Sequence, residues 1–164
     1  MNVCFFRHGI AVEPGSPGVA EESRTLTDDG RRKTRQAARG LKKLNLGLDS
    51  VLSSPLPRAF ETAEILAQVL ELPRPRQVDQ LLPGTSAAEL LGVLKDLKEK
   101  APVLVGHEPV LSAAVSFLVS GVDSAAIRLK KAGMAFVKLD VLTPQPKGNL
   151  LLLLSPGALR RLGK

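Results

Sequence analysis

Short apolar runs alternate along this 164-residue chain with longer segments in which apolar residues recur at helical spacing. The runs predict strands over residues 2–6, 50–53, 77–79, 102–105, 135–139 and 150–154, and the periodic segments predict helices over residues 28–44, 57–71, 86–100 and 110–120. Strands that alternate with helices build a mostly parallel sheet with both faces covered. We therefore expect a three-layer α/β/α sandwich with about six strands, formed by a single domain over residues 1–164.

The longest apolar run, residues 150–154, consists only of leucine and is far too short to span a membrane. It predicts a strand buried on both faces, which favours a covered sheet. The connection before it, residues 143–148, contains Pro144 and Pro146 and predicts a hairpin-like turn. Cys4, the one cysteine, falls in the first predicted strand and is expected to be a small core residue. Residues 1 and 2 lead straight into that strand, which leaves no room for a signal peptide and favours the cytoplasm.

A formal net charge of +7 and a pI near 9.9 raise nucleic acid as a partner. The chain has no Trp or Tyr and only five Phe, so aromatic platforms for single-stranded nucleic acid are scarce. We therefore expect neither nucleic acid nor a membrane as a partner. Much of the positive charge lies in residues 31–43, on a predicted helix. The basic face of this predicted helix consists of Arg32, Arg35, Arg39 and Lys43. Its predicted buried stripe consists of Thr34, Ala37, Leu41 and Leu44.

An arginine and a histidine leave the end of the first predicted strand together, in Arg7-His8-Gly9. Ligands of open α/β sheets bind at the loops that follow the carboxyl ends of strands. A guanidinium can bind two oxygens of a phosphate at once, and a neutral imidazole can attack phosphorus. The alternative is a surface arginine beside a histidine that only caps a loop.

Two further segments supply the rest of an anion site. Arg58 opens a predicted helix that has proline in its first turn and Ser54 near its N-cap. Free N–H groups at such a position favour an anion and disfavour a cation, so an arginine there needs a compensating anion. His107 stands in Gly106-His107-Glu108-Pro109, again directly after an apolar run. The two histidines of the chain therefore occupy the same kind of position, immediately after a strand.

These motifs together resemble the histidine phosphatase superfamily. The residues that carry the resemblance are Arg7-His8-Gly9, Ser54-Pro55-Leu56-Pro57-Arg58-Ala59 with Glu61-Thr62-Ala63, and Gly106-His107-Glu108-Pro109. The small size and the segment Leu26-Thr27-Asp28-Asp29-Gly30 resemble its phosphohistidine phosphatase branch, the SixA type. The likeness runs from residue 1 to about residue 153, with the motifs in the family's order and spacing.

The resemblance implies a phosphoglycerate mutase-like fold and a metal-independent phosphatase that needs no cofactor. It implies that His8 is the nucleophile and becomes transiently phosphorylated. It also implies that Arg7, Arg58 and His107 hold the phosphoryl oxygens, whose charge is spread over three atoms. The partner it implies is a phosphohistidine-carrying protein, such as the phosphotransfer domain of a histidine kinase. The basic face at residues 31–43 is then either solvated or a docking surface for such an acidic partner.

Many members of the superfamily carry a glutamate that protonates an alcohol leaving group, and here Pro83 stands in its place. Asp79 and Glu108 are weaker candidates for that acid. Without an acid a site still cleaves P–N bonds, because a phosphoimidazole protonated on its other nitrogen leaves as a neutral ring. The leading hypothesis is therefore a protein phosphohistidine phosphatase. The alternatives are a small-molecule phosphomonoesterase that uses Asp79 or Glu108, and a silent phosphate-binding module.

The surroundings of His8 carry two further features. Relatives often have a polar residue after the first motif that adds a phosphate contact, whereas this chain has Ile10-Ala11. Residues 12–25 contain two prolines and two glycines and predict a loop directly after the nucleophile. We expect this loop to lie over the site as a lid or mouth.

Overall fold

The structure is a computed structural model that describes residues 1–124, 127–143 and 145–164, and its centre is a sheet of six strands. The strands are β1 (Asn2–Arg7), β2 (Ser50–Ser53), β3 (Arg76–Gln77), β4 (Pro102–Gly106), β5 (Met134–Val141) and β6 (Lys147–Leu154). The helices are α1 (Asp28–Lys43), α2 (Pro57–Leu70), α3 (Ala87–Asp96), α4 (Val110–Ser120) and α5 (Pro156–Leu162), with short 3-10 helices η1 (Glu21–Ser23) and η2 (Asp79–Leu81).

The strand order is β3-β2-β4-β1-β5-β6. Strands β3, β2, β4 and β1 pair in parallel, β5 pairs antiparallel with β1, and β6 pairs antiparallel with β5. Strand β6 therefore runs in the same direction as β1, and among the strands of the described residues only β5 is reversed. The mostly parallel sheet predicted from the sequence is confirmed.

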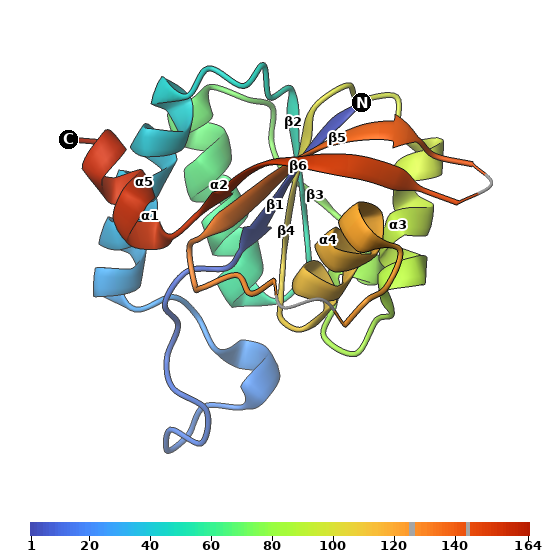
Figure 1. Cartoon of the computed structure of the whole chain (residues 1–164). Coiled ribbons are helices and arrows are strands. Elements are labelled where there is room, and N and C mark those ends of the chain that lie inside the picture. The colour runs from blue at the N-terminus through green and yellow to red at the C-terminus, as the bar shows by residue number, and fades with distance from the viewer. Residues whose placement is uncertain (125–126, 144) are drawn as a thin grey trace.

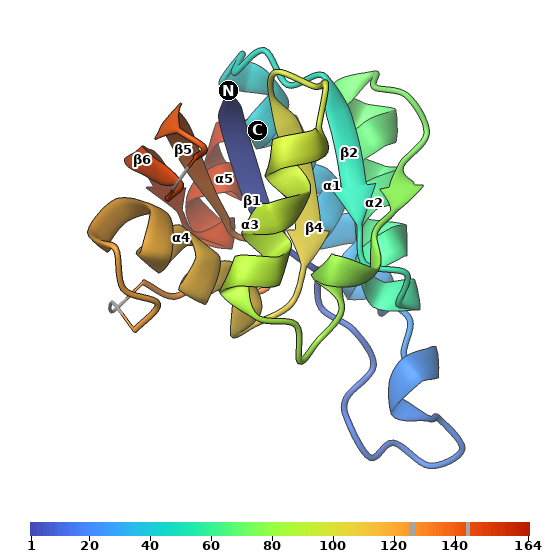
Figure 2. The same ribbon diagram turned by 90° about the vertical axis from the view of Figure 1, so that its right-hand side faces the viewer.

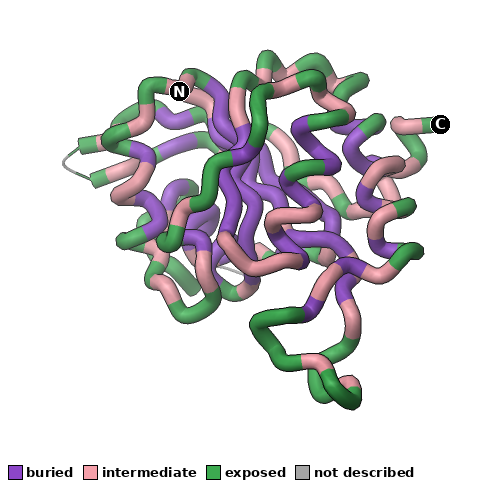
Figure 3. Tube along the Cα trace, turned by 180° about the vertical axis from the view of Figure 1, so that it is seen from behind, coloured by how far each residue is buried: buried purple, intermediate pink, exposed green. Residues whose placement is uncertain are grey.

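Helices cover both faces of the sheet, so the molecule has the three layers that the sequence predicts (Figures 1 and 2). Helices α1, α2 and α5 pack on one face and α3 and α4 on the other. Strand β1 contributes to both cores by simple alternation, since Cys4 and Phe6 face the first set of helices and Val3 and Phe5 the second. The strands at the centre of the sheet are buried along their length (Figure 3).

Cys4 is fully buried, and burial raises the pKa of its thiol, so it is the unreactive core residue that the sequence predicts. On α1 the predicted stripe also packs inward: Thr34, Ala37 and Leu41 are buried and Leu44 is partly buried against the same core. Among the described residues, no helix combines the length and the apolar character needed to cross a bilayer.

The prediction that residues 150–154 are buried on both faces is wrong. They form the end of β6, which lies at the edge of the sheet, and Leu151 and Leu153 are 49% and 46% exposed. A run of leucines indicates a strand, but the strand order decides whether both faces are covered. Strands β5 and β6 pair as the predicted hairpin requires, although Pro144 in their connection lies outside the described residues.

Three element predictions also need correction. Helix α3 starts after the capping box of Ser86 and Glu89 as expected, but it ends at Asp96 because Leu97 is already extended. The third strand is shorter than predicted and ends at Gln77, so that Asp79 opens η2. Helix α5 was not predicted, since its seven residues are too few to show a helical period; its N-cap is Ser155, which accepts from the N–H of Ala158.

The close packing of α1 on α5 yields a test of the fold with two glycines. A Cβ at Gly40 would lie 1.9 Å from the carbonyl oxygen of Leu159, whereas a Cβ at Gly92 in α3 would meet nothing within 4 Å. We expect Gly40→Ala to lower the free energy of unfolding by about 1–3 kcal/mol, the usual cost of overpacking. The matched change Gly92→Ala should raise it by about 0.5–1 kcal/mol, because alanine favours a helix interior. Urea unfolding followed by circular dichroism measures both, and shifts of the same sign would contradict this packing.

Candidate active site

The two histidines lie side by side because β1 and β4 end in step. Arg7, the last residue of β1, pairs with Gly106, the last residue of β4, and the His8 N–H donates to the Gly106 carbonyl at 3.1 Å. His8 and His107 follow directly, and their ring centroids are 5.0 Å apart. Both side chains are buried, with 5% and 3% of their surface exposed. The carboxyl ends of two parallel strands therefore bring together the two residues that the sequence singled out.

A backbone carbonyl fixes the tautomer of His8. Its Nδ1 lies 2.7 Å from the carbonyl oxygen of Gly9, and since that oxygen can only accept, Nδ1 must carry the proton. The lone pair of the neutral ring is then on Nε2. Burial, and after it the charges of Arg58, Arg7 and Lys131, lower the pKa of His8 to about 3, against the opposing effect of the Gly9 hydrogen bond. The ring is neutral at physiological pH.

Gly9 also connects this histidine to the start of α2. The Gly9 N–H donates to Thr62 Oγ1 at 3.0 Å, and the Thr62 hydroxyl donates to the carbonyl of Arg58 at 2.7 Å. A Cβ at Gly9 would lie 2.2 Å from Thr34 Oγ1, so any larger residue would require the buried Thr34 side chain to move. The glycine of the first motif is required for this close approach.

His107 is held by Ser54. Its Nε2 lies 2.9 Å from Ser54 Oγ, and the N–H of Leu56 donates to the same hydroxyl oxygen at 3.3 Å. The pKa of His107 is lowered to about 3, mainly by burial of the ring and further by electrostatic interaction with His8, Arg58 and Arg7. Sequence reasoning placed Ser54 in the N-cap region of α2. The N-cap is Leu56, which makes no side-chain capping bond, and the Ser54 hydroxyl contacts the imidazole instead.

The two predicted arginines come from different elements, β1 and α2. Arg58 follows Pro57 in the first turn of α2 and is 3% exposed; its guanidinium donates to the Glu21 carbonyl at 3.0 Å and lies 3.1 Å from Glu21 Oε1. Arg7 ends β1 and donates to the carbonyl of Leu129 at 2.9 Å. The charges of both arginines lower the pKa of both histidines. The four residues Arg7, His8, Arg58 and His107 therefore form one cluster.

The two acid candidates lie elsewhere. Asp79 is exposed in η2 and, within the described residues, has no hydrogen bond or ion pair with the four clustered residues. Glu108 accepts from the Ser112 hydroxyl, which in turn accepts from the N–H of Leu129, the residue whose carbonyl holds Arg7. The Glu108 charge also favours the charged form of Arg7. Its contacts therefore orient the loop that fixes Arg7.

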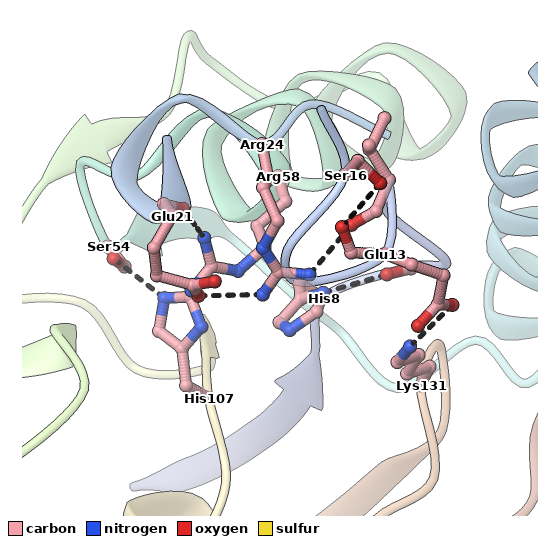
Figure 4. Close-up of polar contacts among 11 residues, drawn as sticks. His8, Glu13, Ser16, Glu21, Arg24, Ser54, Arg58, His107 and Lys131 are labelled. Carbon is pink, nitrogen blue, oxygen red and sulfur yellow. Dashed lines mark hydrogen bonds and ion pairs between the residues drawn. The ribbon is translucent and has the colours of Figure 1, made fainter. Parts of the chain in front are cut away.

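Two residues of the site were missed from the sequence, Glu21 and Arg24. They lie in the loop of residues 12–25, which extends from the carboxyl edge of the sheet (Figure 1), and Figure 4 shows them above the imidazoles of His8 and His107. Arg24 is buried and donates to the Val12 carbonyl and to Glu21 Oε1, both at 2.7 Å. Apart from the prediction that this loop covers the site, nothing in the sequence separates these residues from ordinary loop charges.

The arrangement is suited to binding a phosphoryl group beside a neutral imidazole. The guanidinium groups of Arg24 and Arg58 lie above the two rings (Figure 4), and the charge of Arg7 acts on both, so the site supplies permanent positive charge. Within the parts of the chain that the structure describes, no three His, Cys, Asp or Glu side chains gather in a way that could hold a metal ion.

Comparisons with known proteins decide the family. The family model of the histidine phosphatase superfamily (branch 1) matches residues 3–83. An uncharacterized protein of Picosynechococcus sp. is 37% identical over 163 residues, which are 95% of this chain and 97% of that protein. The chain belongs to the histidine phosphatase superfamily.

Solved structures of this superfamily share the fold over nearly the whole chain. The protein histidine phosphatase SixA complexed with tungstate is 25% identical, with a TM-score of 0.83 over 96% of this chain and 98% of that one. SixA from Agrobacterium tumefaciens is 19% identical, with a TM-score of 0.79 over 94% and 97%. A mycobacterial glucosyl-3-phosphoglycerate phosphatase is 19% identical, with a TM-score of 0.73 over 94% and 99%. The phosphoglycerate mutase-like α/β fold is confirmed, and the chain is a phosphatase of this superfamily.

The buried histidines of this phosphatase generate a prediction about pH. An unfolded histidine has a pKa of about 6.5, whereas His8 and His107 have pKa values of about 3 in the folded chain. As pH falls below 6.5 the unfolded state binds protons first, so the stability that the neutral rings contribute is lost between pH 6.5 and 3. At pH 5 we expect a loss of about 2 kcal/mol for each histidine.

Nitrogen NMR of the two imidazoles and urea unfolding at pH 7 and pH 5 test this. Both rings should remain neutral at pH 5, with the proton of His8 on Nδ1. The variant His107→Gln should lose less stability than wild type between these pH values, because one of the two protonation equilibria is gone. An imidazole that titrates near its ordinary value would contradict the buried, neutral site.

Proposed function

We propose that this chain is a metal-independent protein phosphohistidine phosphatase whose residues 1–164 act as one catalytic domain. The observation that carries the proposal is the state of His8: a buried, neutral imidazole with its proton on Nδ1, held by the Gly9 carbonyl, and its lone pair on Nε2. A nucleophile that attacks phosphorus must be unprotonated, and this one is unprotonated without the help of a base.

The proposed reaction has two steps. His8 Nε2 attacks phosphorus in line, the new N–P bond forms, and the P–N bond of the substrate breaks. The leaving imidazole, which keeps a proton on its other nitrogen, departs as a neutral ring. Water then attacks the phosphohistidine of the enzyme; His8 leaves as a neutral ring with its Nδ1 proton in place, and both protons of the water remain with the released phosphate.

Arg7, Arg58 and His107 are proposed to hold the three phosphoryl oxygens. The two guanidinium groups offer charged donors, which are the stronger hydrogen-bonding partners for such an anion. Nε2 of His107 is taken by Ser54, which leaves Nδ1 as the ring nitrogen for the substrate. A phosphoryl group in transfer is stabilised mainly by positioned positive charge, and arginines supply this charge where other enzymes use a metal.

The proposed substrate class rests on whether a carboxylate near the site can protonate the leaving group. Asp79 is exposed and uncoupled from the cluster, and Glu108 is engaged with Ser112. Glu21, the carboxylate that does contact Arg58, has its pKa lowered by hydrogen bonding to Arg24 and by the charges of Arg24 and Arg58. Because Glu21 is ionised it cannot donate a proton, and the contacts of the other two carboxylates do not place them to protonate an alkoxide. This favours P–N substrates over alkyl phosphate esters and disfavours the phosphomonoesterase alternative.

The partner is proposed to be a phosphohistidine-carrying protein, in line with the printed function of the SixA structure. We place the chain in the cytoplasm on the family resemblance. The basic face of α1 is not part of this proposal. Within it, Arg32 pairs with Asp29 and Arg35 donates to the uncharged side chain of Gln68. A solvated surface is the ordinary state of such a helix face, and the proposal does not depend on it.

Trapping of the phosphorylated enzyme tests the nucleophile. Wild type mixed with radiolabelled phosphohistidine protein and stopped without acid should carry label, and His8→Ala should carry none. Turnover should fall at least about a thousandfold in that variant, since the group that forms the intermediate is gone. A melting temperature close to that of wild type would show that the fold is retained. Label that persists in His8→Ala would move the nucleophile to another residue.

The leaving-group preference tests the substrate class. We expect the rate on phosphoimidazole and phosphohistidine protein to exceed that on alkyl phosphate esters at least about a hundredfold, the usual worth of a missing general acid. Aryl esters of acidic phenols should fall between them. Asp79→Asn and Glu108→Gln serve as the matched pair, and neither should change the ratio. Alkyl esters that react as fast as phosphohistidine, with this activity lost in Asp79→Asn, would establish the small-molecule alternative.

A further inference from the structure

The loop of residues 12–25 places a cation and an anion of its own at the site. The Arg24 side chain, 9% exposed, is held by the Val12 carbonyl and by Glu21 Oε1. The same Glu21 oxygen lies 3.1 Å from the guanidinium of Arg58. Figure 4 shows the two guanidinium groups together above His8 and His107, with the Glu21 carboxylate between them and the His107 ring. One carboxylate oxygen therefore bridges Arg24 and a residue of the proposed phosphoryl site.

Arg24 shares with Arg7 and Arg58 the marks of an anion-binding residue. In all three side chains Nε is buried without a hydrogen-bond partner. The charge of Arg24 lowers the pKa of Arg58 and of His107, so it acts on the centre of the site. Burying one guanidinium beside another is unfavourable unless an anion joins them. The Glu21 side chain is 58% exposed and screened by water, and it compensates this cost only in part.

Glu21 occupies the donors that a phosphoryl oxygen would use. Its pKa is lowered, first of all by the hydrogen bond from Arg24, so it is an anion under physiological conditions. It lies in η1, a three-residue helix of exposed residues whose N-cap makes no side-chain hydrogen bond. Apart from the contacts of Glu21 with Arg24 and Arg58, few contacts among the described residues oppose movement of its side chain away from the site. A phosphoryl group carries more negative charge than the Glu21 carboxylate and has three oxygens, so it binds the same N–H groups more strongly.

We propose that Arg24 is a third phosphoryl-binding arginine, and that Glu21 is an internal anion which the phosphoryl group displaces from Arg24 and Arg58. The inference rests on the proposed function, because it adds a donor and a competitor to that same site. It assigns the loop of residues 12–25 a direct part in binding, besides covering the site. In the ligand-free state the Glu21 carboxylate balances part of the charge of Arg24 and Arg58.

Vanadate binding, measured by isothermal titration calorimetry, tests both residues without turnover. Arg24→Gln should weaken binding at least about tenfold, the worth of one hydrogen bond to a charged group, and Arg24→Lys should recover part of this loss. Glu21→Gln should tighten binding about two- to fivefold, as expected when a partly exposed competing ion pair is removed. Glu22→Gln is the matched control: it makes the same change of charge one residue away, at an exposed position, and should leave the Kd unchanged.

The opposite changes in vanadate Kd expected for Arg24→Gln and Glu21→Gln distinguish this proposal from a purely structural role of the two residues. If Arg24 only pins the loop through Val12, Arg24→Gln would speed hydrogen exchange in residues 12–25 and leave the vanadate Kd unchanged, which would overturn the assignment. If Glu21 only holds Arg24 in place, Glu21→Gln would weaken binding or leave it unchanged, and its role as a competitor would be lost. Wild type that binds vanadate but does not hydrolyse phosphohistidine would refute the proposed function and leave this test standing. Wild type that binds no vanadate would overturn both.

Discussion

The pairing of Arg7 with Gly106 is the contact on which the site depends. Strand β1 lies at the centre of the sheet, between β4 and β5, and both neighbours fix the level at which it ends. On one side the His8 N–H donates to the Gly106 carbonyl; on the other the Ala132 N–H lies 3.1 Å from the carbonyls of both Arg7 and His8. A shift of one residue in this register would turn His8 to the other face of the sheet. The two histidines lie side by side because of the strand register, and their position does not depend on contact between the rings.

A second set of hydrogen bonds transmits that position to α2. Gly9 uses its carbonyl to hold the proton of His8 and its N–H to contact Thr62, and Thr62 reaches back to the carbonyl of Arg58. His8 and Arg58 are thereby fixed relative to each other by three consecutive hydrogen bonds that involve backbone and hydroxyl groups. Because these groups are buried, each contact is hard to replace by water, and the geometry is maintained without a ligand.

The parts of the fold that were predictable from the sequence are those set by local patterns. A strand that ends at Arg7-His8-Gly9 and a helix that begins at Pro57 are visible in a few consecutive residues, and parallel topology then brings their ends together. The burial of residues 150–154 is decided by strand order, which places β6 at the edge, so the leucines alone could not show it. Arg24 and Glu21 belong to a loop whose path depends on distant partners such as Arg58. Their role is a property of the tertiary structure.

The electrostatics of the site connect three features that look separate. Burial of the two imidazoles, and after it the charges of the neighbouring arginines, keeps both rings neutral, so His8 has a lone pair on Nε2. The same positive field keeps the neighbouring Glu21 ionised, so the carboxylate closest to the reaction can balance charge but cannot deliver a proton. A phosphoryl group whose leaving group departs as a neutral ring needs no proton, and it brings the negative charge that the arginines require. The proposed nucleophile, the lack of a protonating carboxylate and the proposed internal anion therefore all relate to one arrangement, the arginines near the carboxyl end of β1.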